Sequence, residues 1–513
     1  MSASISAVGR EVDVVVIGSG FGGAVTACRL AQAGRSVVIL ERGKEYPTGR
    51  GEMTATGHGT DTVRHGHFQV DRGTNMNVIR GIGVGGGSLH YFGVRLRTPA
   101  DVFHNGRWPK EVTREVLDPY YDLAGDMLKA APLQPNPVLG VPTRSTAFLE
   151  AARQARRTRD VPSYVPIAVN TSAEPEATKA GVPQTPCVFC GECVIGCPPS
   201  ESFNGNVNAR ALLTLNYLAV AQTHGAGLFA EHLVNRIRQD GDGFEVEVTD
   251  MRDPTHWEIG VVRAKQVVLG AGTMGSTEIL LKSQQTLPPL SPMLGQNFSA
   301  NGDFLIPKTT DTPQDLQPTS GPTITVGADF STSNNRIYIE DLGRIPFLEA
   351  VVGTDKDIPI EVKRHEIGYL GMGSDAGNGV LSILQDKVHL DWNPQQSLGL
   401  YNEIISALRE LSQKLGGNYR NPLKYDPQTG AGLTTAHPLG GCVMGDTPQQ
   451  GVVNPRGEVY GVPGLFVADG ACVPSAVIVN PSYTITAIAE RVAFWMIHGR
   501  EMAANDSHTP ANN

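Results

Sequence analysis

The stretch Asp13-Val-Val-Val-Ile-Gly-Ser-Gly-Phe-Gly-Gly23 decides how this chain begins to fold. Residues Val14 to Ile17 form a short, fully apolar run, which is typical of a buried strand. The glycines after this run allow a tight turn into a helix that we expect to begin near Gly22. A strand, a glycine turn and a helix in this order place backbone N–H groups where they can bind phosphate oxygens. The stretch therefore predicts the first half of a nucleotide-binding βαβ unit.

Individual residues of this unit have separate roles in the prediction. Gly18 permits the turn, Gly20 lets the backbone approach a pyrophosphate, and Gly23 lets the helix pack closely on the strand. A second apolar strand, Ser36 to Leu40, ends at Glu41, whose carboxylate can accept hydrogen bonds from a ribose diol. The spacing predicts a bound dinucleotide, which on this evidence is either NAD or FAD.

The composition is that of a soluble globular protein. Of the 513 residues, 40% are hydrophobic and 18% are charged, and the length predicts two or three domains. The 42 basic and 51 acidic side chains give a net charge of −9, which disfavours nucleic acid as a partner. The sequence contains no run of eighteen apolar residues, so it predicts no transmembrane helix. Residues 1–10 lack the features of a signal peptide. We therefore expect a cytoplasmic protein.

The order of segments predicts that the chain leaves the nucleotide-binding unit and later returns to it. Buried strands that lead into glycine turns recur at 267–275 and at 464–470. Between them, strands with period two from 304 to 392 predict a sheet with one covered face, in a separate substrate domain. We also expect helices at 207–223, 401–415 and 482–497, a polar lid-like stretch at 42–78, and a disordered tail at 501–513.

Four of the seven cysteines lie close together, at Cys187, Cys190, Cys193 and Cys197. Their spacing, C-x2-C-x2-C-x3-C-P, is that of ferredoxins, in which thiolates hold an iron–sulfur cluster. In two-cluster ferredoxins the fourth cysteine binds the other cluster, whereas this sequence has a single such motif. The loop at 187–197 is therefore an iron–sulfur site, a zinc site, or a group of thiols or disulfides without metal.

Six motifs taken together resemble those of the glucose-methanol-choline (GMC) oxidoreductases, most closely the cholesterol-oxidase-like branch. They are the glycine stretch at 18–23, Gly-Val-Gly-Gly-Gly-Ser at 83–88, Gly-Ala-Gly-Thr at 270–273, His-Pro-Leu-Gly-Gly at 437–441, Gly-Leu-Phe-Val-Ala-Asp-Gly at 464–470, and Asn-Pro-Ser-Tyr-Thr-Ile-Thr at 480–486. The resemblance implies an α/β fold with a Rossmann-like FAD-binding domain and a second α+β domain built on a large antiparallel sheet. On this basis we expect residues 1–310 and 431–500 to form the FAD-binding domain and residues 311–430 the substrate domain.

The resemblance also implies a reaction. Members of the family oxidise an alcohol to a carbonyl by hydride transfer to the flavin N5 atom, and O2 or another electron acceptor then reoxidises the cofactor. The nearest branch implies a bulky secondary alcohol such as a sterol, and the main alternative is a sugar or aminoglycoside hydroxyl. A further alternative is an electron-transferring dehydrogenase with an iron–sulfur cluster. A non-catalytic flavin-binding member is disfavoured, because both His437 and Asn480 are present.

Three residues are candidates for the chemistry. The resemblance makes His437 the active-site histidine, since a histidine beside the alcohol can accept its proton, and the alternative is a histidine that bonds a loop carbonyl. The resemblance makes Asn480 its partner, which positions the hydroxyl and contacts the flavin edge, and the alternative is a helix N-cap before Pro481. Glu340 corresponds to a glutamate that moves the proton in steroid isomerisation, and the alternative is a turn residue.

Other residues are expected to contact the cofactor. They are Gly18, Gly20, Phe21, Gly22, Gly23, Glu41, Arg42, Gly83, Gly85, Gly86, Ser88, His90, Val234, Gly270, Ala271, Asp469 and Gly470. Asp469 is expected near the ribityl or pyrophosphate region and Val234 near the adenine. His90 resembles the histidine that choline and pyranose oxidases bond covalently to the flavin 8α-methyl carbon, and the alternative is a histidine packed near the isoalloxazine ring.

Overall fold

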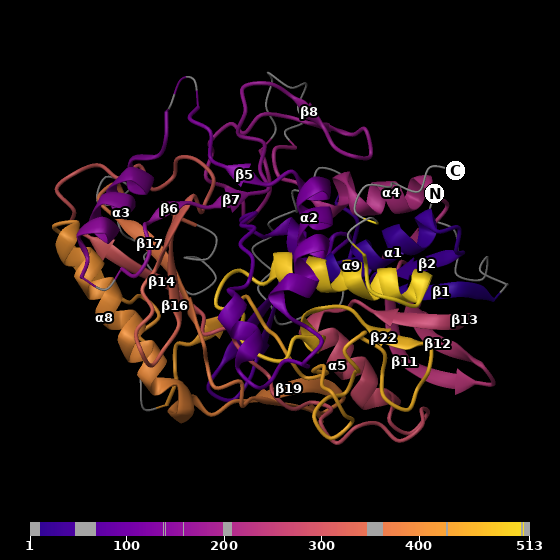
Figure 1. Ribbon diagram of the computed structural model, residues 1–513. Coiled ribbons are helices and arrows are strands. Elements are labelled where there is room, and N and C mark those ends of the chain that lie inside the picture. Colours follow the sequence, from indigo (N-terminus) through magenta and orange to yellow (C-terminus); the bar gives the residue numbers. More distant parts are fainter. Residues whose placement is uncertain are drawn as a thin grey trace.

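The computed structural model describes residues 11–46, 68–136, 138, 140–156, 158–198, 208–345, 363–426, 429–503 and 506. Residues 47–67, in the middle of the lid-like stretch expected at 42–78, and most of the tail after residue 503 lie outside the described residues. Two large sheets dominate the described part, and Figure 1 shows them on opposite sides of the molecule. Among the helices that the structure describes, none combines the length and apolar character that crossing a lipid bilayer requires.

The first sheet contains the strand that the glycine stretch predicts. Its order is β10 (Gly227–Phe229), β2 (Val37–Leu40), β1 (Val12–Ile17), β13 (Glu258–Leu269), β12 (Gly243–Asp250) and β11 (His232–Asp240), with β22 (Leu465–Val467) beside the end of β13. β1 pairs in parallel with β2 and β13, and its last four residues are buried, which explains their unbroken apolar run. The carboxyl ends of these strands meet at one edge, where the chain turns at Gly18 and Gly270.

Helices that begin at this edge cover the sheet. α1 (Phe21–Gln32) follows β1 and packs against α9 (Ser482–His498) and α4 (Tyr217–Thr223), while α5 (Gly272–Ser283) follows β13 and α2 (Arg114–Leu128) packs on α9. A buried network joins α1, α9 and α4. The Arg29 guanidinium donates to Glu490 at 2.7 and 2.8 Å, and the Tyr217 hydroxyl donates to the same carboxylate at 2.6 Å. Because α9 begins at Ser482, two positions after Asn480, this network helps to fix one side of the site described below.

The helix expected at 207–223 is wrong for residues 208–216, where the structure has only a 3-10 turn, Leu213–Leu215, before α4. Arg210 lies in an isolated bridge with Val169, and α4 begins at Tyr217. Asn216 fixes that start, because its side chain accepts a hydrogen bond from the Tyr217 amide at 2.6 Å. Arg210 is buried and donates to the Leu89 carbonyl at 2.9 Å. This bond ties the preceding segment to the glycine-rich turn at 83–88, so the segment does not continue as a helix.

The second sheet is antiparallel. Its order is β20 (Asn418–Arg420), β14 (Phe304–Thr310), β17 (Ile367–Gly373), β16 (Ile337–Leu342), β15 (Val326–Asp329) and β6 (Ser163–Tyr164). α8 (Leu398–Lys414) and α3 (Thr143–Gln154) pack against it, and their apolar faces share a core with Tyr369 and Trp392. Together the two sheets confirm the expected fold class, an α/β chain with a Rossmann-like unit and a second sheet.

Two strands expected in the second sheet lie elsewhere. β18 (Val380–Leu384) and β19 (Lys387–Asp391) pair with each other in a separate hairpin that packs on α5. Gln385 and Asp386 both have positive φ, 49° and 60°, which suits a two-residue hairpin turn. One face of the hairpin is covered by α5 and the other is more exposed. Its strands therefore show the same period-two pattern as a strand of the large sheet.

Short strand pairs complete the described part. They are β4 (Asn77–Gly81) between β3 (Phe68–Arg72) and β21 (Thr434–Thr435), β5 (Ala131–Pro132) with β7 (Pro166–Ile167), and β8 (Glu176–Ala177) with β9 (Pro183–Gln184).

The expectation of a disordered tail is wrong for its first residues. Glu501 accepts hydrogen bonds from Arg491 at 2.8 Å and from the Tyr120 hydroxyl at 2.9 Å, which anchor the chain after α9.

Candidate active site

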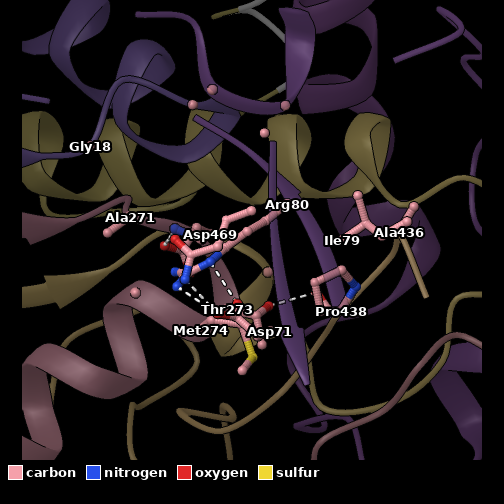
Figure 2. Close-up of a pocket in the computed structure, with 18 of the residues that line it drawn as sticks. Gly18, Asp71, Ile79, Arg80, Ala271, Thr273, Met274, Ala436, Pro438 and Asp469 are labelled. Atoms are coloured by element: carbon pink, nitrogen blue, oxygen red, sulfur yellow. Dashed lines mark hydrogen bonds and ion pairs between the residues drawn. The ribbon is translucent and has the colours of Figure 1, made fainter. Parts of the chain in front are cut away.

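A cavity of about 850 Å³ opens between the two sheets. Its lining comes from the glycine turns of the first sheet, from β3 and β4, from the first turn of α5, and from residues of β14 and β17. Figure 2 shows Gly18, Ala271 and Asp469 on one side of it and Ile79, Ala436 and Pro438 on another. Segments far apart in the sequence thus converge on one space, as a large cofactor and a substrate require.

The glycines at the first sheet leave no room for side chains. A Cβ atom on Gly18 would lie 2.4 Å from the Gly270 carbonyl oxygen, and one on Gly23 would lie 2.0 Å from the Gly18 oxygen. Gly18 also has a φ of +94°, which other residues rarely adopt. At Gly20, by contrast, the nearest atoms to an added Cβ are 3.9 Å away, so that side chain would fill the cradle itself. The turn fits a dinucleotide phosphate against α1.

Glu41 is positioned for a ribose. Its carboxylate is buried and accepts hydrogen bonds from the Ser19 amide at 3.0 Å, the Ser19 hydroxyl at 2.7 Å and the Gly43 amide at 2.8 Å. The oxygen that accepts only the Gly43 amide, Oε1, keeps capacity for a further hydrogen bond, so a ribose hydroxyl can still bind. Val234 lines the same cavity, where the sequence places the adenine side. These residues fit the adenosine half of FAD.

One wall of the cavity carries charged side chains, some of which the sequence motifs did not predict. Arg80 on β4 pairs with Asp71 on β3 at 2.7 Å, as Figure 2 shows, and Arg42 donates to Gln69 at 2.8 Å. Burial, with the nearby charge of Arg80, lowers the pKa of Arg42 to about 10. Arg42 was expected at the cofactor, whereas Arg80 and Asp71 were missed because they belong to none of the motifs in the sequence.

Asp469 lines the cavity, but hydrogen bonds within the protein engage its carboxylate. One oxygen accepts from the Gly272 amide at 2.8 Å and the Ser276 hydroxyl at 2.5 Å, at the start of α5. The other oxygen accepts from the Ala471 amide at 2.8 Å. Burial raises the pKa of Asp469 to about 6. Asp469 therefore fixes the turn at Gly270 to Gly272 against the C-terminal part of the chain.

His437 is held by a carboxylate. Its Nδ1 atom lies 2.8 Å from Asp303, whose side chain is fully buried, while the histidine side chain is 17% exposed and lines the cavity. The same carboxylate accepts from the Thr435 hydroxyl at 3.0 Å and from the Ala436 amide at 2.9 Å. The Asp303 carboxylate accepts a hydrogen bond from the Nδ1–H group. The neutral imidazole therefore has its proton on Nδ1 and its lone pair on Nε2. The alternative of a histidine that bonds a loop carbonyl is not what the structure shows.

Asn480 and Glu340 form a second buried pair. The Asn480 amide nitrogen donates to Glu340 at 3.2 Å. α9 has Pro481 as its N-cap residue, so Asn480 lies one position before the cap and the N-cap interpretation is wrong. Glu340 lies within β16 and is fully buried, so the turn interpretation is wrong too. Asn480 is among the described residues that line the cavity, and Glu340 is not.

Burial raises the pKa of Glu340 well above its ordinary value of 4.5, and the hydrogen bond from Asn480 opposes this shift. The folded protein thus keeps a proton that the unfolded chain releases, and the stability linked to this proton is lost as the pH rises. We expect the melting temperature of Glu340→Gln, relative to that of the wild type, to increase progressively from pH 5 to pH 8. A constant difference across these pH values, measured by circular dichroism, would contradict the protonated assignment.

His90 ends a short 3-10 turn, Gly86–Leu89, beside the cavity. Its Nδ1 atom donates to the Val194 carbonyl at 3.0 Å, and its ring lies 3.8 Å from the Phe68 ring centroid. The Nε2 atom is enclosed by protein. The ring therefore packs beside the cavity with both nitrogens turned into protein.

The structure does not bring the cysteines of the loop together as a metal site. All four cysteines lie within the described part of the chain, where no group of three or more His, Cys, Asp or Glu side chains can hold a metal ion. Burial raises the pKa of the Cys187 thiol well above its ordinary value and that of the Cys190 thiol to about 12. Phe189 and Val194, buried between the cysteines, make the loop a packing element. The expected iron–sulfur or zinc site therefore finds no support.

Much of the cavity lining is apolar. It includes Phe68, Val70, Ile79, Phe92, Val94, Met274, Leu305, Ile306, Leu342, Ile345 and Leu370. The second sheet supplies four of these side chains, from β14, β16 and β17, and the small sheet of β3 and β4 supplies three. Such a surface excludes water and favours an apolar ligand in the cavity that His437 and Asn480 also line.

Comparisons with known proteins give two matching family models and several relatives. Residues 402–489 match the model described as GMC oxidoreductase, and residues 16–77 match the NAD(P)-binding Rossmann-like domain. The chain is 29% identical to a cholesterol oxidase of Mycobacterium tuberculosis (strain ATCC 25618 / H37Rv), over 94% of this chain and 90% of the relative. It is 25% identical to a cholesterol oxidase of Acinetobacter baumannii, over 98% and 97%. A crystal structure of pyridoxine 4-oxidase from Mesorbium loti shares the fold, with a TM-score of 0.64 at 18% identity over 95% of this chain and 99% of that one.

Proposed function

Because the chain belongs to the GMC oxidoreductases, an FAD-dependent family, we propose that it oxidises a bulky, apolar secondary alcohol to a ketone. The apolar wall of the cavity that His437 and Asn480 also line is the observation that carries the substrate class. A sugar or aminoglycoside would leave many hydroxyl groups without partners against this wall, and each such loss costs binding energy. The two cholesterol oxidase relatives support a sterol-like substrate.

The cofactor would bind along the cavity with its adenosine half at Glu41 and Val234 and its pyrophosphate at the glycine turn after β1. When bound, FAD supplies the N5 atom that accepts hydride from the carbinol carbon of the alcohol. Gly86 and Gly87, which line the cavity, would pass close to the flavin. The apolar lining keeps water away from the reacting atoms.

His437 would take the hydroxyl proton. Asp303 keeps the imidazole proton on Nδ1, so Nε2 has a lone pair. This lone pair can accept the hydroxyl proton of the alcohol while the carbinol carbon loses its hydride. Asp303 also stabilises the imidazolium that this transfer creates. The Asn480 amide oxygen has no hydrogen-bond partner among the described residues and would accept from the substrate hydroxyl or from an N–H at the flavin edge. We propose no isomerase step, since Glu340 lies behind Asn480 and away from the cavity lining.

A panel of alcohols tests the substrate class. We expect kcat/KM to rise from small sugars through linear alcohols to sterols, as more apolar surface enters the cavity. The panel should be measured with O2 and with an artificial dye, because the acceptor that gives the faster turnover identifies the route of reoxidation. Higher kcat/KM for a sugar or an aminoglycoside than for any sterol or other bulky apolar alcohol would contradict the proposal.

The cofactor should be removable. We propose that FAD binds without a covalent bond, since both nitrogens of the His90 ring are turned into protein. We expect acid precipitation of the purified protein to leave the yellow colour in the supernatant. A yellow pellet from the wild type and a colourless one from His90→Ala would instead establish the covalent bond.

A further inference from the structure

The residues Ser299 to Asp303, which we call the bridging segment, contact both chain segments that carry the proposed site residues. On one side, Ser299 forms an antiparallel bridge with Leu439, and Asp303 holds His437 at 2.8 Å. On the other side, Asn301 reaches the residues just before Asn480. One short, fully buried segment therefore lies between the two halves of the site.

Asn301 holds three consecutive residues by their backbone. Its side-chain oxygen accepts from the Val477 amide at 2.8 Å and from the Ile478 amide at 3.0 Å. Its amide nitrogen donates to the Val479 carbonyl at 2.9 Å. All three bonds are buried, and the residue that follows in the chain is Asn480. The side chain of Asn301 thus makes the hydrogen bonds that a neighbouring strand would otherwise supply.

The segment that Asn301 holds is strained. Ile478 has a φ of +73°, and a β-branched residue rarely adopts this left-handed conformation. Such a conformation is energetically unfavourable and persists where surrounding contacts determine it. The two hydrogen bonds to the amides at 477 and 478 are contacts of this kind. Without them, the backbone before Asn480 would relax toward an ordinary conformation and move the side chain.

The bridging segment is itself fixed. The Asp375 carboxylate accepts from the Ser299 hydroxyl and the Ala300 amide, both at 2.7 Å, and from the Gly302 amide at 3.2 Å. A Cβ atom on Gly302 would lie 2.5 Å from the Gly373 carbonyl oxygen, so this turn packs directly on β17. The bridging segment is therefore held in place on the second sheet, and it in turn holds His437 and the residues before Asn480.

We propose that Asn301 is a positioning residue that places Asn480 by holding residues 477–479 in their strained conformation. The proposal rests on the proposed function, because Asn480 is there assigned to the alcohol and the flavin edge. Asn301 itself contacts neither, and acts through Asn480. Its removal should therefore slow the oxidation of bound alcohol much more than it weakens the binding of alcohol or FAD.

Hydrogen exchange tests the structural half without any turnover. In Asn301→Ala, the amides of Val477 and Ile478 should exchange about tenfold faster or more, since each loses its acceptor. Asn170→Ala is the matched control, because Asn170 is also buried and holds a loop by donating to the Glu174 and Gln184 carbonyls at 3.0 and 3.1 Å. The control should leave exchange at 477–478 unchanged. Unchanged exchange in Asn301→Ala would overturn the proposal.

A double-mutant cycle tests the functional half. We expect Asn301→Ala to lower the rate constant of anaerobic flavin reduction by about 10–100-fold, the scale of a displacement near 1 Å, with the alcohol dissociation constant changed by less than about threefold. In the Asn480→Ala background the same substitution should change the rate by less than about twofold, because the residue through which it acts is gone. Equal effects in the two backgrounds would overturn the proposal.

Two further outcomes are distinguishable. If Asn301→Ala does not fold, Asn301→Asp replaces it, since a carboxylate keeps the acceptor for residues 477 and 478 and loses the donor to Val479. We expect that variant to restore slow exchange at the two amides and to recover part of the reduction rate. If no alcohol reduces the wild-type flavin, the proposed function fails, while the exchange experiment still decides whether Asn301 holds the segment.

Discussion

Replacing His437 by alanine should lower the rate of flavin reduction by alcohol by about 10²–10⁴-fold, the usual contribution of a positioned general base. The alcohol would keep its apolar contacts but lose the acceptor for its proton. We therefore expect the dissociation constant of the alcohol and the occupancy of FAD to change little. Stopped-flow absorbance of the flavin band, with oxygen excluded, measures the rate directly.

His224→Ala is a suitable control for this substitution. His224 is exposed, bonds the Val220 carbonyl at 2.9 Å at the end of α4, and is absent from the described cavity lining. Its replacement should leave the reduction rate within about twofold of the wild-type rate, as expected for a surface change. Full-rate flavin reduction by the His437 variant would refute the assignment of the proton acceptor.

Replacing Asp303 by asparagine should cost nearly as much, on the order of 10²–10⁴-fold in the same rate, because a carboxylate that fixes a histidine tautomer becomes an amide. The amide can donate to Nδ1, and the imidazole would then have its proton on Nε2, facing the substrate. The variant would also lose the negative charge that stabilises the imidazolium. Anaerobic reduction at several pH values measures the loss.

The control for Asp303 is Asp446→Asn, at an exposed carboxylate that accepts from the Lys110 amide at 3.2 Å. It should leave the rate nearly unchanged. If Asp303→Asn reduced its flavin as fast as the wild type, His437 would not need the carboxylate, and the proton transfer would have to be assigned differently.

The first sheet could be predicted from the sequence because its signals are local. The apolar run before Gly18 and the acid at Glu41 follow from burial of β1 and from the turn that a phosphate needs. The helix expected at 207–223 was wrong in its first part because a buried arginine bonds the distant Leu89 carbonyl, and the asparagine cap lets the α-helix begin only at Tyr217. The hairpin β18–β19 failed because periodicity shows that a strand has a covered face, and does not show what covers it.

The candidate site was predictable in part for the same reason. His437 and Asn480 stand in recognisable motifs, and the structure places both at the cavity. Asp303 and Asn301 stand in a segment without periodicity, and their roles come from contacts across more than 130 positions of the chain. The ferredoxin-like spacing of the cysteines left an iron–sulfur site, a zinc site and a metal-free loop open, and the described residues show no group of metal ligands there, since spacing alone does not decide where the thiols point.

The measurement that tests the central claim most directly is anaerobic mixing of the FAD-loaded protein with a sterol that bears deuterium at the carbinol carbon. The account predicts that the unlabelled sterol bleaches the flavin band, that the deuterated sterol does so more slowly, and that a ketone forms in proportion. A flavin band that no sterol or other bulky secondary alcohol bleaches, in protein that holds its full complement of FAD, would contradict the account.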